Sequence, residues 1–152
     1  MTLPVSPIPI RGLRQQSDER TTDAITIEIP MSAHDRRRVR RLLDAPDGVR
    51  LALELPTGTV LHPGQVLHRE GDRVYVVAAA DEEVLVIRPR DMGEAARIAH
   101  LIGNLHRDIE VTDAEIIALA DDTLADRLAK AGAPVERAHR PFRGRAPGEH
   151  AH

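Results

Sequence analysis

The chain of 152 residues contains no cysteine and no tryptophan, and it has one tyrosine and one phenylalanine. Without cysteine it cannot form disulfides, thiolate zinc sites, iron–sulfur clusters or a cysteine nucleophile. Any tightly bound metal ion must therefore be held by histidine and carboxylate side chains. Such ligands suit borderline divalent ions such as nickel, zinc, copper or cobalt.

Long apolar runs are also missing. No stretch approaches the roughly 18 consecutive apolar residues that a membrane-spanning helix needs. The N-terminal sequence MTLPVSPIPIRGLRQQ has prolines where a signal peptide requires a continuous apolar segment. We therefore expect a cytoplasmic protein with no membrane contact.

The net charge is close to zero, because 21 lysines and arginines face 24 aspartates and glutamates. There is thus no overall electrostatic attraction for nucleic acid. The basic run 36–41 could meet nucleic acid or an acidic protein surface, or it could be a strand with solvated arginines. Only Tyr75 and Phe142 could stack on bases, which disfavours an RNA-recognition sheet. We expect no nucleic-acid partner.

The N-terminal half has the pattern of a small all-β module. Residues 1–23 are expected to be irregular, because three prolines remove backbone donors. Apolar residues then alternate with polar ones over 25–29 and 49–55, which is the period of half-buried strands. Closely spaced Gly and Pro turns separate further short strands, expected at 60–61, 66–67 and 73–77.

The second half has a different pattern. A continuous apolar run at 84–87 predicts a strand buried on both faces. A helix follows over about 92–102, and Gly103-Asn104 is a suitable stop. Strands at 109–111 and 115–120, a second helix capped by Asp121 or Asp122 and a last strand at 134–139 complete the order βαββαβ.

We therefore predict an α+β protein in which a small all-β domain precedes a ferredoxin-like βαββαβ domain. The β-rich, partner-binding domain is expected over 24–88, with a boundary near Arg88 to Asp91. The ferredoxin-like domain, for metal binding and dimerisation, is expected over 89–142 together with the strand 84–88. Residues 143–152 are expected to be a flexible tail.

Eight histidines are available as metal ligands. Those at 34, 62 and 68 lie in charged or turn segments and are expected to be surface residues. His100 lies opposite the apolar stripe of its helix and should face water or a partner. His139, at the end of a strand, could be either a surface residue or a metal ligand.

Three histidines stand out by position. His106 follows the helix stop and lies in a connection, where side chains are free of packing and flanking elements hold them still. Residue type alone also leaves a packing role open for it. His150 and His152 form His-Ala-His, and in an extended segment the two imidazoles point the same way. No phosphate-binding glycine loop, Ser-His-Asp set or paired carboxylates can be argued from spacing.

At this point the sequence resembles the UreE family of urease accessory metallochaperones. The helix ending Ala-His-Leu-Ile-Gly-Asn-Leu-His (99–106) is similar to the family's H-L-G-N-R-H. The stretches 53–61, 64–67 and 78–85 resemble its "l.LprG..L", "GDvL" and "aa.Ee.vl" segments. The match also includes Asp47-Gly48, Asp122-Thr123-Leu124, Gly132 and Pro141-Phe142.

The resemblance implies a non-enzymatic homodimer that binds nickel through His106, with His150 and His152 adding to the coordination. His139 and His100 are weaker candidates, and zinc or copper could occupy the same site. It also implies handover to the urease apoenzyme through the accessory GTPase. The chain departs from the family at Leu105, where arginine is usual. The alternative is a ferredoxin-like RNA- or protein-binding module with incidental histidines.

Overall fold

The computed structural model describes residues 5–13 and 23–145, and it divides into two compact units, Met1–Ala79 (unit 1) and Ala80–His152 (unit 2). The division falls between strands β6 (Arg73–Ala79) and β7 (Asp81–Ile87), ahead of the boundary expected near residue 88. The reason is that β7 pairs with strands of unit 2 along its length. The strand expected at 84–88 is therefore part of unit 2.

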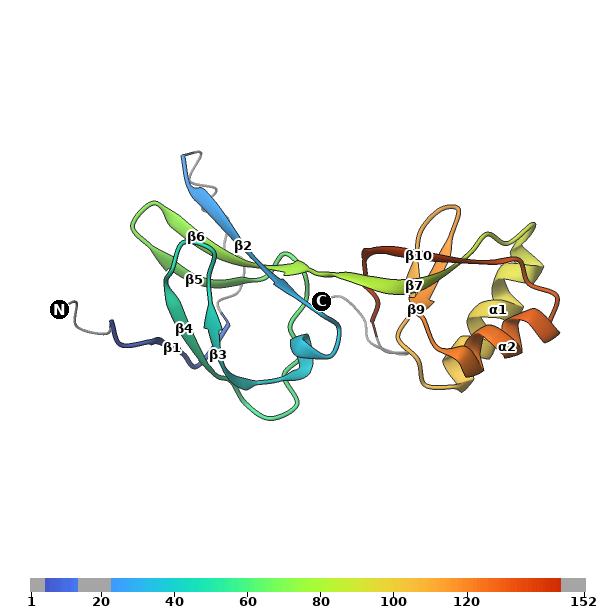
Figure 1. Cartoon of the computed structure of the whole chain (residues 1–152), viewed down its shortest axis with the longest axis horizontal. Coiled ribbons are helices and arrows are strands. Elements are labelled where there is room, and N and C mark those ends of the chain that lie inside the picture. Colours follow the sequence, from blue (N-terminus) through green and yellow to red (C-terminus); the bar gives the residue numbers. More distant parts are fainter. Residues whose placement is uncertain (1–4, 14–22, 146–152) are drawn as a thin grey trace. The chain divides into compact units, whose positions relative to one another are not determined.

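Unit 1 is all-β, as predicted, and contains two three-stranded sheets (Figure 1). One has the order β1-β4-β3, from Ile8–Ile10, Arg50–Glu54 and Arg40–Asp44. The other has the order β2-β6-β5, in which β2 is Ile25–Met31 and β5 is Val66–Glu70. A 3-10 turn, η1, covers Asp35–Arg37.

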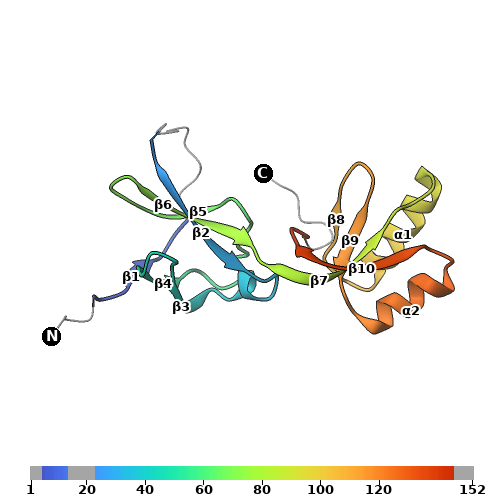
Figure 2. The same ribbon diagram turned by 45° about the horizontal axis from the view of Figure 1, so that its top comes forward.

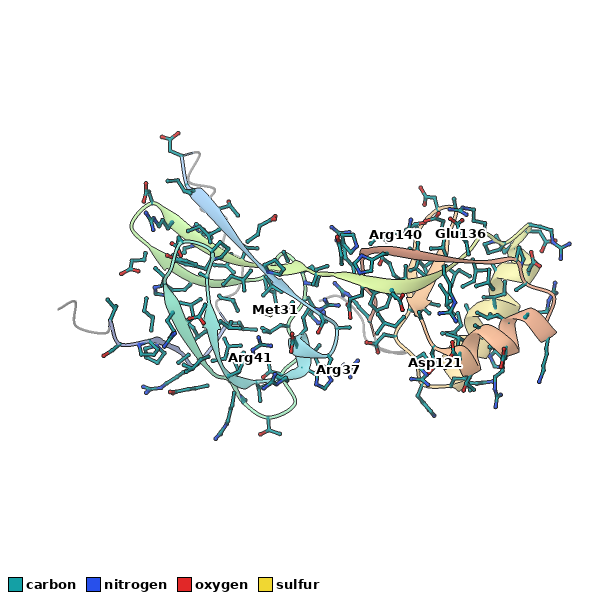
Figure 3. All side chains as sticks on the ribbon, viewed as in Figure 1. Met31, Arg37, Arg41, Asp121, Glu136 and Arg140 are labelled. Atoms are coloured by element: carbon teal, nitrogen blue, oxygen red, sulfur yellow. The ribbon has the colours of Figure 1, made fainter. Side chains whose placement is uncertain are left out.

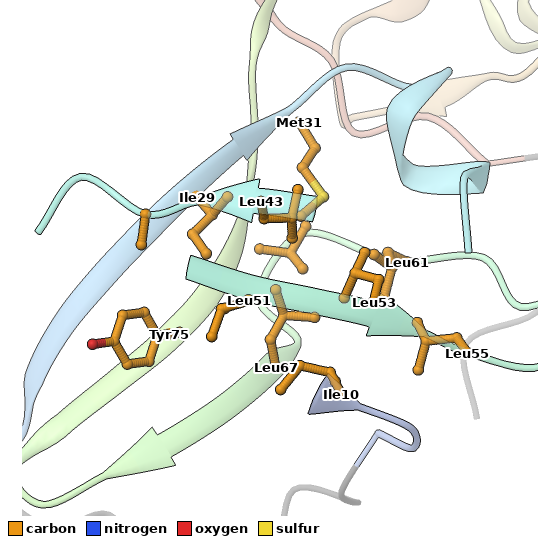
Figure 4. Close-up of a cluster of buried hydrophobic side chains, with 12 residues drawn as sticks. Ile10, Ile29, Met31, Leu43, Leu51, Leu53, Leu55, Leu61, Leu67 and Tyr75 are labelled. Carbon is orange, nitrogen blue, oxygen red and sulfur yellow. The ribbon is translucent and has the colours of Figure 1, made fainter. Parts of the chain in front are cut away.

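The core of unit 1 follows from the alternation in the sequence. Leu51, Leu53 and Leu55 are at most 2% exposed, whereas the residues between them face outward or are half-buried. Figure 4 shows these leucines packed with aliphatic side chains from the other strands, and with Tyr75 as the one ring. Burial of each such side chain contributes about 1.5–3 kcal/mol, so an aliphatic core is sufficient without tryptophan.

Two local expectations in this unit are wrong. The N-terminal segment is not wholly irregular, because β1 pairs in parallel with β4 from Ile8 to Ile10. Proline is tolerated there since β1 is an edge strand that does not need every donor. Val60-Leu61 forms no strand; the Leu61 side chain is fully buried and its N–H donates to the Arg36 carbonyl at 2.8 Å.

Unit 2 has the predicted ferredoxin-like order. Its elements are β7, α1 (Met92–Asn104), β8 (Glu110–Val111), β9 (Ile116–Leu119), α2 (Asp122–Lys130) and β10 (Val135–Pro141). The sheet order is β10-β7-β9-β8, and every pair is antiparallel. Both helices lie on one face of this sheet (Figure 2), where Leu85 and Ile87 pack against Ile98 and Ile102.

The other face of the sheet is covered by the segment after β10. The residues of the sheet and helices that pack together on the helix-covered face are here termed the helix-side core. Val86 and Ile117 alternate with residues of this core and so point to the opposite face, yet each is at most 2% exposed. Glu110 pairs with Ile117 and shares its face, and its Oε2 accepts a hydrogen bond from the Arg143 N–H at 2.8 Å. Residues 142–145, here termed the strap, therefore cross this face.

The strap corrects the expectation of a flexible tail from residue 143. Arg145 forms an isolated antiparallel bridge with Ile109, with N–H to O distances of 2.9 and 3.0 Å. Phe142 is fully buried, although it is outside the helix-side core. The sequence pattern could not reveal this, because the strap is fixed by residues more than thirty positions away. Residues 146–152 lie outside the described part.

Candidate metal centre

His106 lies at the C-terminal end of α1, in a Schellman-type helix ending. The His106 N–H donates to the Gly103 carbonyl at 2.9 Å, and the Arg107 N–H to the Ile102 carbonyl at 3.4 Å. His106 itself adopts φ of +53°, the left-handed conformation that glycine usually supplies at this position. Among the described residues it is the sole non-glycine residue with positive φ.

The helix does not stop where the sequence suggested. Gly103 and Asn104 are both helical, and the left-handed residue comes two positions later. Leu105 packs half-buried against the helix-side core, so the chain turns only after this contact is made. This turn leaves the His106 side chain exposed. The left-handed conformation is less favourable for histidine than for glycine, and the two hydrogen bonds of the helix ending hold it in place.

The connection after His106 is anchored to α2. Arg107 Nη2 donates to Asp121 Oδ2 at 3.1 Å, and Asp121 Oδ1 accepts from the Leu124 N–H at 2.9 Å as the N-cap of α2. Asp121 is labelled at the start of this helix in Figure 3. Of the two carboxylates considered as caps, Asp121 is the cap, and Asp122 pairs with Arg137 at 2.8 Å.

The other candidate histidines lie on separate elements. His100 is exposed on α1, and its Nε2 lies 3.1 Å from Asn104 Nδ2, four residues further along the helix. His139 is exposed on β10, opposite Glu83 of β7. His150 and His152 lie outside the described residues. Within residues 5–13 and 23–145, no group of three or more histidine or acidic side chains is placed to hold a metal ion.

In the sheet of unit 2, ion pairs connect β10 with the residue that follows β7 and the residue that precedes β9. Arg88 bridges Glu115 and Glu136, and Arg140 donates to the second oxygen of Glu115 (Figure 3 labels Glu136 and Arg140). The hydrogen bond from Arg140, followed by the arginine charges and Arg88, lowers the pKa of the Glu115 carboxyl despite its partial burial. These carboxylates are therefore engaged with arginines within the sheet.

The basic run 36–41 is not a continuous cationic surface. Arg36 is 3% exposed, and its Nη1 donates to the Met31 carbonyl at 2.8 Å. Arg41 pairs with Asp35 at 2.8 Å, and Arg38 lies 3.6 Å from the same carboxylate. Figure 3 labels Arg37 and Arg41 in this segment. Nucleic-acid binding was suggested by a continuous basic run, and the structure does not present this run as a continuous basic surface.

No helix in the described residues is both long and apolar enough to cross a membrane.

Two family models match the chain almost end to end. The UreE urease accessory protein N-terminal domain matches residues 10–80, and the corresponding C-terminal domain matches 82–152. The junction between the matches coincides with the division between unit 1 and unit 2.

Several urease accessory proteins named UreE are similar to this chain. That of Deinococcus radiodurans is 47% identical over 143 residues, which cover 94% of this chain and 92% of the relative. That of Synechococcus sp. (strain JA-3-3Ab) is 49% identical over 116 residues, covering 76% and 78%. That of Burkholderia thailandensis is 38% identical over 123 residues, covering 81% and 57%.

An all-β domain joined to a ferredoxin-like domain, with these matches to both, defines a two-domain urease accessory protein. The chain belongs to the UreE family.

Proposed function

We propose that this protein binds nickel through His106 and delivers it for assembly of the urease metallocentre. The observation that carries the proposal is the exposed imidazole of His106, held in a left-handed turn at the end of α1. Imidazole is a suitable ligand for nickel, and a site without thiolates can release its ion. Zinc or copper would compete for the same donors.

A homodimer would complete the site. One imidazole cannot hold nickel tightly, and the described residues of one chain offer no set of three donors. A two-fold interface through unit 2 brings the same patch of both chains together, so two His106 side chains could share one ion. His150 and His152 would add ligands, and His139 or His100 could assist.

The protein would act as a carrier in the cytoplasm and not as an enzyme. It would pass nickel to the urease apoenzyme through the accessory GTPase, with unit 1 as the partner-binding domain. Family membership supports this role. The competing role, an RNA- or protein-binding module, lacks support from the basic run because Arg36 is buried.

Calorimetry with nickel tests the proposal. His106→Gly removes the imidazole and suits the backbone, since glycine accepts φ of +53° without strain. We expect at least a tenfold loss of affinity. The matched control is His34→Ala, which removes an exposed histidine of unit 1. Unchanged affinity and stoichiometry in His106→Gly would show that the ligand is misassigned.

A further inference from the structure

An ion pair joins the connection that carries His106 to the start of α2. Arg107 Nη2 donates to Asp121 Oδ2 at 3.1 Å, and Asp121 is the residue just before this helix (Figure 3). The Arg107 side chain is 50% exposed and that of Asp121 is 31% exposed. Because Arg107 directly follows His106 in the chain, this pair belongs to the immediate surroundings of the imidazole proposed to bind nickel.

Arg107 has a structural task at this position. Its N–H closes the helix ending on the Ile102 carbonyl, but this bond is long, at 3.4 Å. The guanidinium adds a second link, to the start of α2. On either side of His106, Leu105 and Ile109 pack against the helix-side core. Arg107 therefore ties down the exposed stretch between these two contacts.

The same guanidinium is a cation next to a residue that would bind a divalent cation. Arginine remains charged at any pH at which proteins are folded, so titration cannot remove this charge. The Cα atoms of adjacent residues are about 3.8 Å apart, and charges act over a Debye length of about 10 Å at 0.1 M salt. An uncompensated guanidinium at Arg107 would therefore repel a divalent ion at the His106 imidazole.

Asp121 uses its two carboxylate oxygens for different partners. Oδ1 accepts from the Leu124 N–H at 2.9 Å and caps α2, whereas Oδ2 accepts from Arg107. Asparagine caps helices about as well as aspartate, so the capping bond does not require a charge. The negative charge is what compensates the guanidinium, together with the positive end of the helix dipole.

We propose that Asp121 is a charge-compensating residue for the His106 site. By pairing with Arg107, it allows this arginine to hold the connection without opposing a divalent cation at the imidazole. Asp121 acts through Arg107 and is therefore a positioning residue and not a ligand, since both of its oxygens are already engaged. This inference rests on the proposed function, in which His106 binds nickel.

The next residue along the chain offers a matched control. Asp122 also pairs with an arginine, Arg137 of β10, at 2.8 Å. The connection that carries His106 leads into β8, which is at the opposite edge of the sheet from β10. Asp122→Asn therefore removes the same charge from the start of α2 but leaves Arg107 with its partner.

The first measurement compares the nickel affinity of full-length variants by calorimetry in 0.1 M salt. We expect Asp121→Asn to weaken affinity about twofold to threefold, because the cap survives while Arg107 loses its countercharge. Asp122→Asn should weaken it by less than about 1.5-fold, because its countercharge is directed to the other edge of the sheet. Where Asp121→Asn fails to fold, Asp121→Ser replaces it, since serine also caps helices.

The second measurement removes the arginine as well. Arg107 has already lost its partner in Asp121→Asn, so the addition of Arg107→Gln removes its charge and no further anchor. We expect this double variant to recover the affinity that Asp121→Asn loses. In 1 M salt, where the Debye length is about 3 Å, the loss in Asp121→Asn should itself disappear. A purely structural role of Asp121 would produce neither the recovery nor the salt dependence.

The outcomes separate this inference from the proposed function. Nickel binding that depends on His106 but is unchanged by Asp121→Asn overturns the inference alone. A double variant as weak as Asp121→Asn also overturns it, and would instead indicate that the Asp121 carboxylate is itself a ligand. An equal loss in Asp122→Asn contradicts the role given to Arg107. Absence of nickel binding by the unsubstituted chain refutes the proposed function, and this inference with it.

Discussion

At the scale of single residues, His106 combines a backbone disfavoured for its residue type with an exposed side chain. Non-glycine residues in the left-handed helical region are destabilised by roughly 1–2 kcal/mol each. Glycine at this position of a Schellman ending would avoid that cost. The backbone at this position therefore favours glycine, and metal binding by the imidazole, as proposed above, would account for the histidine.

The cost of the left-handed backbone at His106 leads to a prediction about the stability of unit 2. His106→Gly should raise the free energy of unfolding of unit 2 by about 0.5–1 kcal/mol, because it relieves the left-handed strain. Urea denaturation in the absence of metal measures this change. His106→Ala is the contrasting variant: it also lacks the imidazole, but it keeps a Cβ and should gain nothing. A loss of stability in His106→Gly would mean that the imidazole makes packing contacts.

At the scale of elements, α1 begins with a tightly bonded cap. Asp91 Oδ1 accepts from the Glu94 N–H at 2.8 Å, and Glu94 Oε2 accepts from the Arg90 N–H at 2.7 Å. The Arg90 guanidinium also donates to both oxygens of Glu94. These side-chain bonds, then the backbone bond, lower the pKa of Glu94 from 4.5 to about 2 although burial opposes the shift. The cap is therefore strongest when Glu94 is ionised.

The cap predicts how acid affects unit 2. Because the pKa of Glu94 is lower in the folded state, its contribution to stability is complete above about pH 4.5. It is lost progressively as the pH falls towards 2. Urea denaturation at several pH values should show a smaller loss between pH 4.5 and 2 in Glu94→Gln than in the unsubstituted chain. An equal loss in the two chains would contradict the role given to Glu94.

At the scale of the whole molecule, each unit has a closed core of its own. The unit 1 cluster draws all its buried residues from positions below 80, and the unit 2 cluster draws all of its residues from positions above 80. Each unit also completes its own sheets, since every paired strand has its partners in the same unit. The two units therefore have separate means of folding.

This independence predicts the behaviour of separate fragments. Residues 80–152 alone should fold, with a cooperative thermal transition by circular dichroism, and should bind nickel within about threefold of the full chain. Residues 1–79 should fold but bind nickel weakly, because His106 and the tail are absent. A fragment 80–152 that is unfolded, or folded without nickel binding, would place part of the site or its support in unit 1.

Much of the architecture could be predicted from the sequence. The alternation of apolar and polar residues over 49–55 predicted a strand, because a strand points successive side chains to opposite faces. The order βαββαβ was likewise predicted from the local periodicity of each segment. The strand β1 and the strap were missed for one reason: each is fixed by partners distant in sequence and has no periodic pattern of its own. The arginine run was also misleading, because burial of Arg36 depends on the turn around it.

The sequence by itself determined the chemistry available to this protein: no thiolate, few aromatic rings, and histidines as the nitrogen ligands for a metal ion. It also placed one histidine just after a helix, because capping signals are local. Only the tertiary structure decided that His106, rather than Gly103 or Asn104, takes the left-handed turn. It also decided that Arg145 pairs with Ile109, because a bridge between residues that the sequence separates by 36 positions has no local signal.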